Sequence, residues 1–171
     1  MNLLFAIAPE RFRDEELDIP KRMFEEAGIG IDIASTAPGT CTGMLGAALE
    51  ASLAFGDVNP DNYAGIVIVG GTGSEDHLWG SEELQRLTRL FFEQGKVIAA
   101  ICLAPVVLAR AGILSGRQAT VYPSPAAVQE LEQGGANFVE IPVVADMQIV
   151  TANGPEAATG FAETILTKLE C

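Results

Sequence analysis

Short apolar runs alternate along the chain with longer segments in which apolar residues recur at helical spacing. Short apolar runs rich in β-branched residues are typical of strands that are covered on both faces. They predict strands at residues 3–7, 31–34, 65–69, 97–101, 117–122, 139–146 and 148–152. The longer segments are bounded by capping residues, proline or glycine, as helices usually are. They predict helices at residues 14–27, 81–94, 124–133 and 156–169, with a further helix that begins near Pro105.

This alternation predicts an α/β protein, a three-layer αβα sandwich built on a mostly parallel, flavodoxin-like sheet. The 171 residues, of which 49% are apolar, suit one compact domain over residues 1–171. Ligand sites in such sheets lie beyond the carboxyl ends of the strands. We therefore expect the functional residues at those ends.

The apolar stretch of residues 97–114 places Cys102 on a predicted turn between a strand and a helix. Pro105 suits the first turn of that helix, where its missing N–H costs nothing. The geometry resembles a nucleophile elbow, in which the next backbone N–H, here that of Leu103, faces a developing oxyanion. The positive end of the helix dipole favours a thiolate at Cys102. A buried core cysteine is the alternative, since free cysteine is among the most buried residue types.

The first predicted helix, residues 14–27, contains an acidic residue in an unusual place. Asp14 suits the N-cap and Gly28 lies just past the predicted end. Pro20 lacks the N–H that would bond the carbonyl of Glu16, so the helix should kink or loosen near Glu16. The alternative for Glu16 is a solvated acid in the first turn of a helix.

Two glycine-rich segments complete the predicted organisation. Residues 40–56 are ambiguous, because their apolar run suits a short helix but is interrupted by glycines. The segment Gly70-Gly71-Thr72-Gly73 follows a predicted strand, and a glycine pair there lets backbone approach a ligand closely. It has no GxGxxG pattern, so it predicts no dinucleotide cofactor.

Composition excludes several classes of function. A formal net charge of −13 and a pI of about 4.3 would repel nucleic acid and anionic membranes. The N-terminus has no basic segment and its apolar run is short, so we expect a cytoplasmic protein with no membrane span. Cys41, Cys102 and Cys171 are widely spaced, which indicates neither a disulfide framework nor a metal site. Cys41 has a structural interpretation, and Cys171 is expected to be exposed.

Three motifs together resemble the ThiJ/PfpI superfamily, which has the class I glutamine amidotransferase-like fold. They are AAICLAP at residues 99–105, the glycine pair after a strand, and DEELDIP at residues 14–20. The resemblance implies that Cys102 is the nucleophile and that Glu16 lies close to its sulfur. It also implies that the N–H of Gly71, after Gly70, completes the oxyanion hole with that of Leu103. A β-hairpin-like excursion at residues 40–56 and a homodimer or larger assembly are further implications.

The chain departs from this resemblance at three positions. The peptidase branch has histidine after the cysteine, where this chain has Leu103. Relatives usually have proline before the glycine pair, where this chain has Val69, and many have arginine at the position of Asn153. The first departure argues against a peptidase, and the third weakens any transfer of substrate range.

The residues that remain suit a cofactor-free reaction of small carbonyl compounds. The resemblance implies that Cys102 adds to a small α-oxoaldehyde such as methylglyoxal, or to its adduct on a protein, while Glu16 moves protons. His77, the chain's one histidine, is expected in a surface loop, although it could assist from there. Tyr122 could hydrogen-bond in the pocket, but a buried core tyrosine is the preferred interpretation. An alternative function is a redox sensor or chaperone that uses the same cysteine, and a peptidase or amidase is less favoured.

Overall fold

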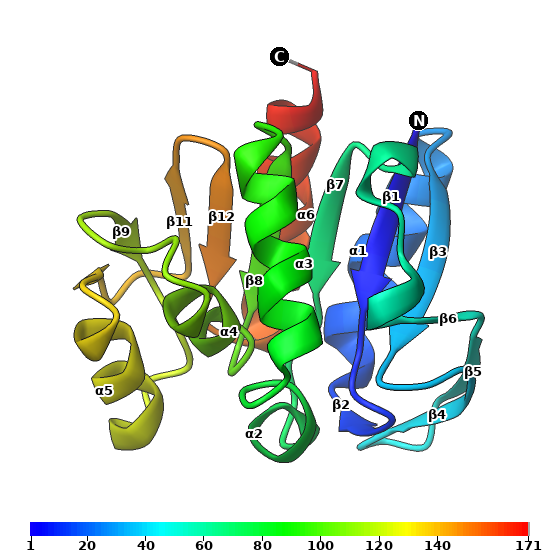
Figure 1. The fold of residues 1–171 in the computed structure, drawn as a ribbon, viewed down its shortest axis with the longest axis horizontal. Helices are drawn as coiled ribbons and strands as arrows, with labels where there is room; N and C mark the ends of the chain where they lie inside the picture. The colour runs from blue at the N-terminus through cyan, green and yellow to red at the C-terminus, as the bar shows by residue number, and fades with distance from the viewer. Residues whose placement is uncertain (171) are drawn as a thin grey trace.

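The computed structural model describes residues 1–170, and its centre is a seven-stranded sheet (Figure 1). The strand order is β11-β12-β8-β7-β1-β3-β6, and all neighbours are parallel except the β11–β12 pair. This confirms the predicted mostly parallel sheet. The strands are β1 Asn2–Ala6, β3 Gly30–Ser35, β6 Leu53–Ala54, β7 Gly65–Ile68, β8 Val97–Ile101, β11 Val143–Asp146 and β12 Ile149–Ala152.

Helices cover both faces of the sheet and make the molecule the predicted three-layer sandwich. In Figure 1, α3 (Glu82–Glu93) lies in front of the sheet, while α1 (Asp14–Glu26) and α6 (Ala158–Leu169) lie behind it. The short helix α4 (Pro105–Arg110) packs beside α3, and α5 (Pro125–Gln133) packs against α4. Successive strand residues point to opposite faces, so Leu4 belongs to the core under α3 and Phe5 to the core under α1 and α6.

A second, three-stranded sheet settles the ambiguous segment. Strands β4 (Gly39–Gly43) and β5 (Ala48–Ala51) form a hairpin, and β2 (Glu10–Phe12) pairs with β4. Asp14 is not the N-cap of α1. Arg13 occupies that position without a side-chain cap, and the Asp14 carboxylate instead accepts from the N–H groups of Leu45 and Ala47, at 3.0 and 2.9 Å. Asp14 therefore ties the hairpin turn to the start of α1.

Several predicted boundaries were wrong. Pro20 is buried within a continuous α1, and α4 ends at Arg110 instead of continuing through the apolar run to residue 114. The predicted strands at 117–122 and 139–146 shorten to β9 (Gln118–Ala119) and β11, and β9 pairs with β10 (Asn137–Phe138). Single 3₁₀ turns occupy Phe55–Asp57, Pro60–Asn62 and Pro155–Ala157. Cys171 lies outside the described residues.

Candidate active site

Cys102 directly follows β8 and has a backbone conformation that few residues other than glycine adopt. Its φ is 63°, in the left-handed region. Hydrogen bonds hold both sides of this residue, because its N–H donates to the Ala152 carbonyl at 2.8 Å and its carbonyl accepts from the Tyr122 N–H at 2.9 Å. Strained backbone of this kind persists only where the surroundings determine it. The geometry is that of a nucleophile elbow, as the sequence predicted.

Glu16 comes from the first turn of α1 and is completely buried. Neither of its carboxyl oxygens has a hydrogen-bond partner of standard geometry among residues 1–170. Burial raises the pKa of the Glu16 carboxyl from its ordinary value near 4.5 to about 8, although the nearby Cys102 thiol and Gly70 N–H oppose that rise. The interpretation of Glu16 as a solvated acid is therefore wrong.

Gly70 lies between the side chains of Cys102 and Glu16. A Cβ atom built on Gly70 would come within 2.6 Å of both the Cβ of Cys102 and the Oε1 of Glu16. No side chain larger than hydrogen fits there, so glycine is what allows the carboxyl and the thiol to approach each other. The structure thus brings together Cys102 and Glu16, which the resemblance paired.

The sulfur carries its proton more firmly than the sequence predicted. Burial, followed by the charge of Glu16, raises the pKa of the Cys102 thiol to about 12, whereas the N–H groups of Gly71 and Leu103 lower it. Helix α4 is only six residues long and its N-cap is Ala104, so Cys102 lies outside the helix. The predicted preference for the thiolate is therefore opposed by burial and by the charge of Glu16, which raise the pKa of the thiol. Cys102 and Glu16 titrate as a coupled pair that resists carrying two negative charges.

Two backbone N–H groups face the sulfur, as an oxyanion hole requires. They belong to Gly71 and Leu103, and both lower the pKa of Cys102. Gly71 has a φ of 115°, and a Cβ there would lie 2.5 Å from the backbone N of Arg13. The carbonyl of Leu103 accepts from the Trp79 indole N–H at 2.8 Å, which fixes the elbow from the other side. The predicted roles of these two N–H groups are therefore geometrically available.

The sulfur opens into a pocket of about 230 Å³. Its lining comes from the elbow, the glycine loop, the hairpin turn and the start of α1, namely Arg13, Met44, Gly71, Thr72, Cys102, Leu103, Tyr122 and Pro155. The sequence did not predict Arg13 or Met44 in this pocket. Both are brought there by the pairing of β2 with the β4–β5 hairpin, which local sequence patterns do not indicate. A larger groove of about 740 Å³ lies along α1 and the hairpin but is lined by neither Cys102 nor Glu16. The smaller pocket is therefore the candidate site, because it contains the thiol.

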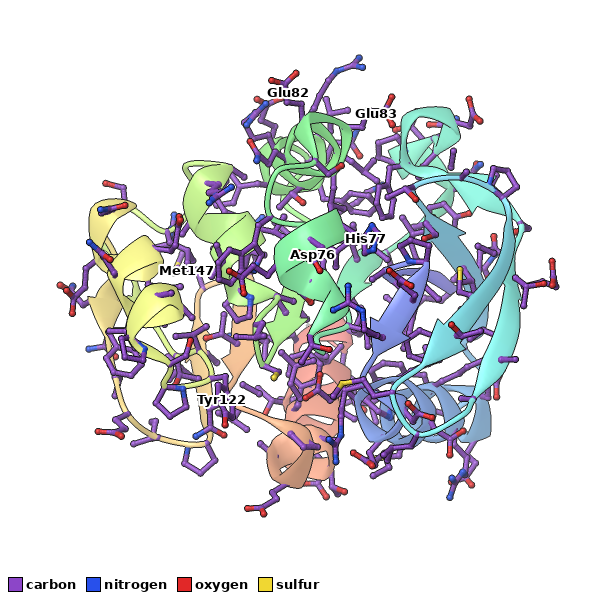
Figure 2. The ribbon with its side chains drawn as sticks, turned by 90° about the horizontal axis from the view of Figure 1, so that it is seen from below. Asp76, His77, Glu82, Glu83, Tyr122 and Met147 are labelled. Carbon is purple, nitrogen blue, oxygen red and sulfur yellow. The ribbon has the colours of Figure 1, made fainter. Side chains whose placement is uncertain are left out.

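Two auxiliary candidates have different positions from those predicted. His77 lies in the short helix α2 (Gly73–His77), not in a loop, and its Nε2 is 3.1 Å from Oε1 of Glu10. It does not line the pocket of Cys102. Tyr122 lines that pocket and is 47% exposed, so the expectation of a buried core tyrosine was wrong. Figure 2, which looks onto the carboxyl ends of the strands, shows Tyr122 and His77 well apart.

The buried cysteines and acids offer little to a metal. Among residues 1–170, no group of three or more histidine, cysteine, aspartate or glutamate side chains is placed to hold an ion. Cys41 is buried in β4, where its sulfur lies 3.8 Å from the Gly39 carbonyl, and this fits its structural interpretation.

A mostly parallel sheet covered on both faces, with a cysteine at the elbow after a strand and a buried carboxyl beside it, places this chain among the α/β proteins with a cysteine elbow. Within that class the chain belongs to the DJ-1/PfpI family, which it matches over residues 1–168. An uncharacterized protein of Methanocaldococcus jannaschii is 48% identical over 168 residues, 98% of this chain and 82% of that protein. The deglycase PfpI of Pyrococcus furiosus is 34% identical over 155 residues, 91% of each chain.

Solved structures agree with this assignment. The crystal structure of a ThiJ/PfpI domain protein from Brachyspira murdochii superimposes with a TM-score of 0.93 at 34% identity. The match covers 99% of this chain and 96% of that one. The family predicted from the cysteine, glycine and acidic motifs is therefore confirmed.

Proposed function

We propose that the chain is a cofactor-free, cysteine-dependent enzyme that acts on small α-oxoaldehydes or on their adducts with proteins. The observation that carries this proposal is the pairing of Cys102, which lines a pocket of about 230 Å³, with a buried carboxyl of raised pKa. Similarity to a protein named deglycase PfpI supports the same reaction class. The pocket volume suits a ligand of a few heavy atoms.

In the proposed reaction, one proton is shared between the thiol and the carboxyl. The form with the proton on Glu16 leaves a Cys102 thiolate, which adds to the aldehyde carbon to form a C–S bond. The aldehyde oxygen, held by the N–H groups of Gly71 and Leu103, takes the Glu16 proton and becomes the hydroxyl of a hemithioacetal. Glu16 is then a carboxylate and can act as a general base.

Glu16 next removes the C–H proton of the hemithioacetal, and the electron pair of that bond forms an enediolate. Glu16 returns that proton to the neighbouring carbon, while the hydroxyl proton on the first carbon passes to the second oxygen, and the product is a 2-hydroxyacyl thioester on Cys102. Water hydrolyses the thioester, which releases a 2-hydroxy acid and restores the thiol. The overall change adds one water to the α-oxoaldehyde without an external oxidant or reductant.

A peptidase or amidase has less support. Such chemistry usually requires a histidine that shuttles a proton between nucleophile and leaving group. The residue after Cys102 is Leu103, and His77 interacts with Glu10 outside the pocket. No described residue therefore supplies an imidazole to the sulfur within one subunit.

A redox function is the second candidate, and the complete burial of the Glu16 carboxyl beside the sulfur, which raises its pKa to about 8, favours it. Two equivalents of hydrogen peroxide would convert the Cys102 thiolate to a sulfinate with release of two waters. A protonated carboxyl beside the sulfur would donate a hydrogen bond to that sulfinate. A redox sensor or a chaperone regulated by oxidation could use this state.

The decisive experiment measures lactate formation from methylglyoxal by the wild-type protein and by Cys102→Ala and Glu16→Gln variants. We expect both substitutions to abolish turnover, while Cys41→Ala, which removes a buried thiol elsewhere, leaves it intact. Mass spectrometry of peroxide-treated protein tests the second candidate. The enzyme proposal is lost if turnover is independent of Cys102, or if none is found while Cys102 alone oxidises to the sulfinate.

Assembly and location complete the proposal. The resemblance to the family supports a homodimer or larger homo-oligomer that acts on a small aldehyde or a modified protein, and the net charge of −13 argues against nucleic acid as a partner. A cytoplasmic location stays a prediction. Among residues 1–170, no helix is both long and apolar enough to cross a membrane. Light scattering of the purified protein would give the number of subunits directly.

A further inference from the structure

Among residues 1–170, Arg13 is the one charged residue that lines the pocket of Cys102. Its neighbours in that lining are apolar side chains, a threonine, a tyrosine and backbone. The whole chain has a net charge of −13, so anions are repelled from most of its surface. The guanidinium is therefore a local positive charge on an acidic protein, and it favours a negatively charged ligand in this pocket.

The backbone of Arg13 is fixed to the catalytic loop. Its N–H donates to the carbonyl of Gly70 at 2.9 Å, and its own carbonyl accepts from the N–H of Glu16 at 3.1 Å. Backbone hydrogen bonds of Arg13 thus connect Gly70, which lies between the thiol and the carboxyl, to Glu16. Its position relative to the sulfur is set by backbone hydrogen bonds and not by a flexible loop.

Hydrogen bonds to Glu15 orient the Arg13 guanidinium but do not use all of its N–H donors. Its Nε lies 2.6 Å from Oε2 of Glu15 and its Nη2 lies 3.4 Å from Oε1 of the same side chain. Nη1 has no hydrogen-bond partner among residues 1–170, and the Arg13 side chain is 31% exposed. Glu15 therefore holds one edge of the planar group, which leaves donors on the other edge for a ligand.

We propose that Arg13 is the anion-binding group of this pocket and holds a negatively charged oxygen next to the carbon that bonds to Cys102. The inference rests on the proposed function, in which that oxygen is the second oxygen of the dicarbonyl. When Glu16 removes the C–H proton, the electron pair moves toward this oxygen and gives it the enediolate charge. The guanidinium then donates a charge-assisted hydrogen bond to the enediolate, while the first oxygen stays at the N–H groups of Gly71 and Leu103.

The arrangement divides the two oxygens of the substrate between two kinds of donor. Neutral backbone N–H groups suit the oxygen that gains and quickly loses charge during addition. A permanent cation suits the oxygen that carries the charge of the enediolate, and such an interaction acts mainly in the transition state. Substrates with two adjacent oxygens are therefore favoured over simple aldehydes.

Turnover of methylglyoxal by charge-matched variants tests this role. We expect Arg13→Gln to lower kcat by about 10- to 100-fold with a smaller change in KM, because a charged hydrogen bond to the transition state is lost. Arg13→Lys should recover part of the rate, since it keeps the charge but not the planar donors. Arg22→Gln is the control, because Arg22 lies on α1, which begins directly after Arg13, pairs with Asp18 at 2.7 Å and is outside the pocket.

Alkylation of Cys102 provides a readout that does not need turnover. Iodoacetate and iodoacetamide react with the same thiolate and differ mainly in the charge of the group beside the reacting carbon. Peptide mass spectrometry follows the rate of each reagent at Cys102. We expect the rate with iodoacetate divided by the rate with iodoacetamide to be about tenfold lower in Arg13→Gln than in wild type or Arg22→Gln. Circular dichroism confirms that the variants are folded.

The outcomes separate this inference from the proposed function. If Arg13→Gln matches Arg22→Gln in both turnover and alkylation ratio, Arg13 binds no anion and the inference is overturned. If wild-type protein does not turn over methylglyoxal but the alkylation ratio still depends on Arg13, the proposed function fails and the anion site stands. A lower rate with an unchanged alkylation ratio assigns Arg13 a structural role through Glu15 and also overturns the inference.

Discussion

The buried carboxyl of Glu16 should make the stability of the protein depend on pH in a way that one substitution removes. Burial raises the pKa of Glu16 to about 8 in the folded chain, whereas an unfolded glutamate titrates near 4.3. Between these values the folded state binds more protons than the unfolded state, so stability falls as pH rises. The contribution of protonated Glu16 to the free energy of unfolding is fully present below about pH 4 and is lost as pH rises to about 8.

The size of the effect follows from the two pKa values. Proton linkage for one such group gives a loss of about 3 to 4 kcal/mol between pH 5 and pH 8. Glu16→Gln cannot ionise, so its stability relative to wild type should increase by that amount over the same interval. All other titrating groups contribute to both proteins and largely cancel in the difference.

Urea denaturation at pH 5, 6, 7 and 8 measures this difference directly. Glu26→Gln is the matched control, since it makes the same change of charge at an exposed position near the end of the same helix. Its stability relative to wild type should stay nearly constant. A difference for Glu16→Gln that is equally flat would mean that the folded protein does not hold Glu16 protonated, and the proposed proton shuttle would lose its basis.

Three further outcomes can be measured on single variants. Gly70→Ala should abolish turnover and slow alkylation of Cys102, because the new methyl group would lie 2.6 Å from both the Cys102 Cβ and the Glu16 carboxyl; equal reactivity in a folded Gly70→Ala protein would contradict the close approach. Cys102→Gly should be more stable to urea than Cys102→Ala by about 1 kcal/mol, since only glycine adopts a φ of 63° without strain, and the reverse order would show that the elbow is relaxed. Asp14→Ala should lower the free energy of unfolding by about 1 to 3 kcal/mol, because two hairpin N–H groups lose their acceptor; an unchanged midpoint would contradict that anchoring role.

The parts of the molecule that the sequence predicted are those with local causes. Cys102 could be placed at an elbow because an apolar strand ends immediately before it and a proline suited to a helix start follows three residues later. The parallel sheet could be predicted from the same alternation. The pairing with Glu16 came from the resemblance to a family, since no local rule carries a first-turn acid into the core.

The parts that were missed depend on long-range packing. Arg13 stands among acids at the start of a helix, where an exposed ion pair is the ordinary expectation, and its backbone bond to the distant Gly70 carbonyl could not be read from the sequence. Tyr122 was expected in the core, yet its backbone N–H donates to the Cys102 carbonyl while the residue stays 47% exposed. Helix α2 spans only five residues, too few to show a helical period.

Reactivity at this site depends on two opposing effects of burial. Burial keeps a proton on Glu16, which a proton shuttle requires, but it also raises the pKa of Cys102 and so disfavours the thiolate needed for attack. The donors that counter the second effect are the N–H groups of Gly71 and Leu103, both of which lower the pKa of the thiol. The same groups are placed to hold the oxygen of the adduct, so in the proposed reaction the negative charge would pass from sulfur to oxygen without leaving these donors. The strained elbow and the glycine loop are therefore needed together, because either one alone would leave a buried thiol that keeps its proton.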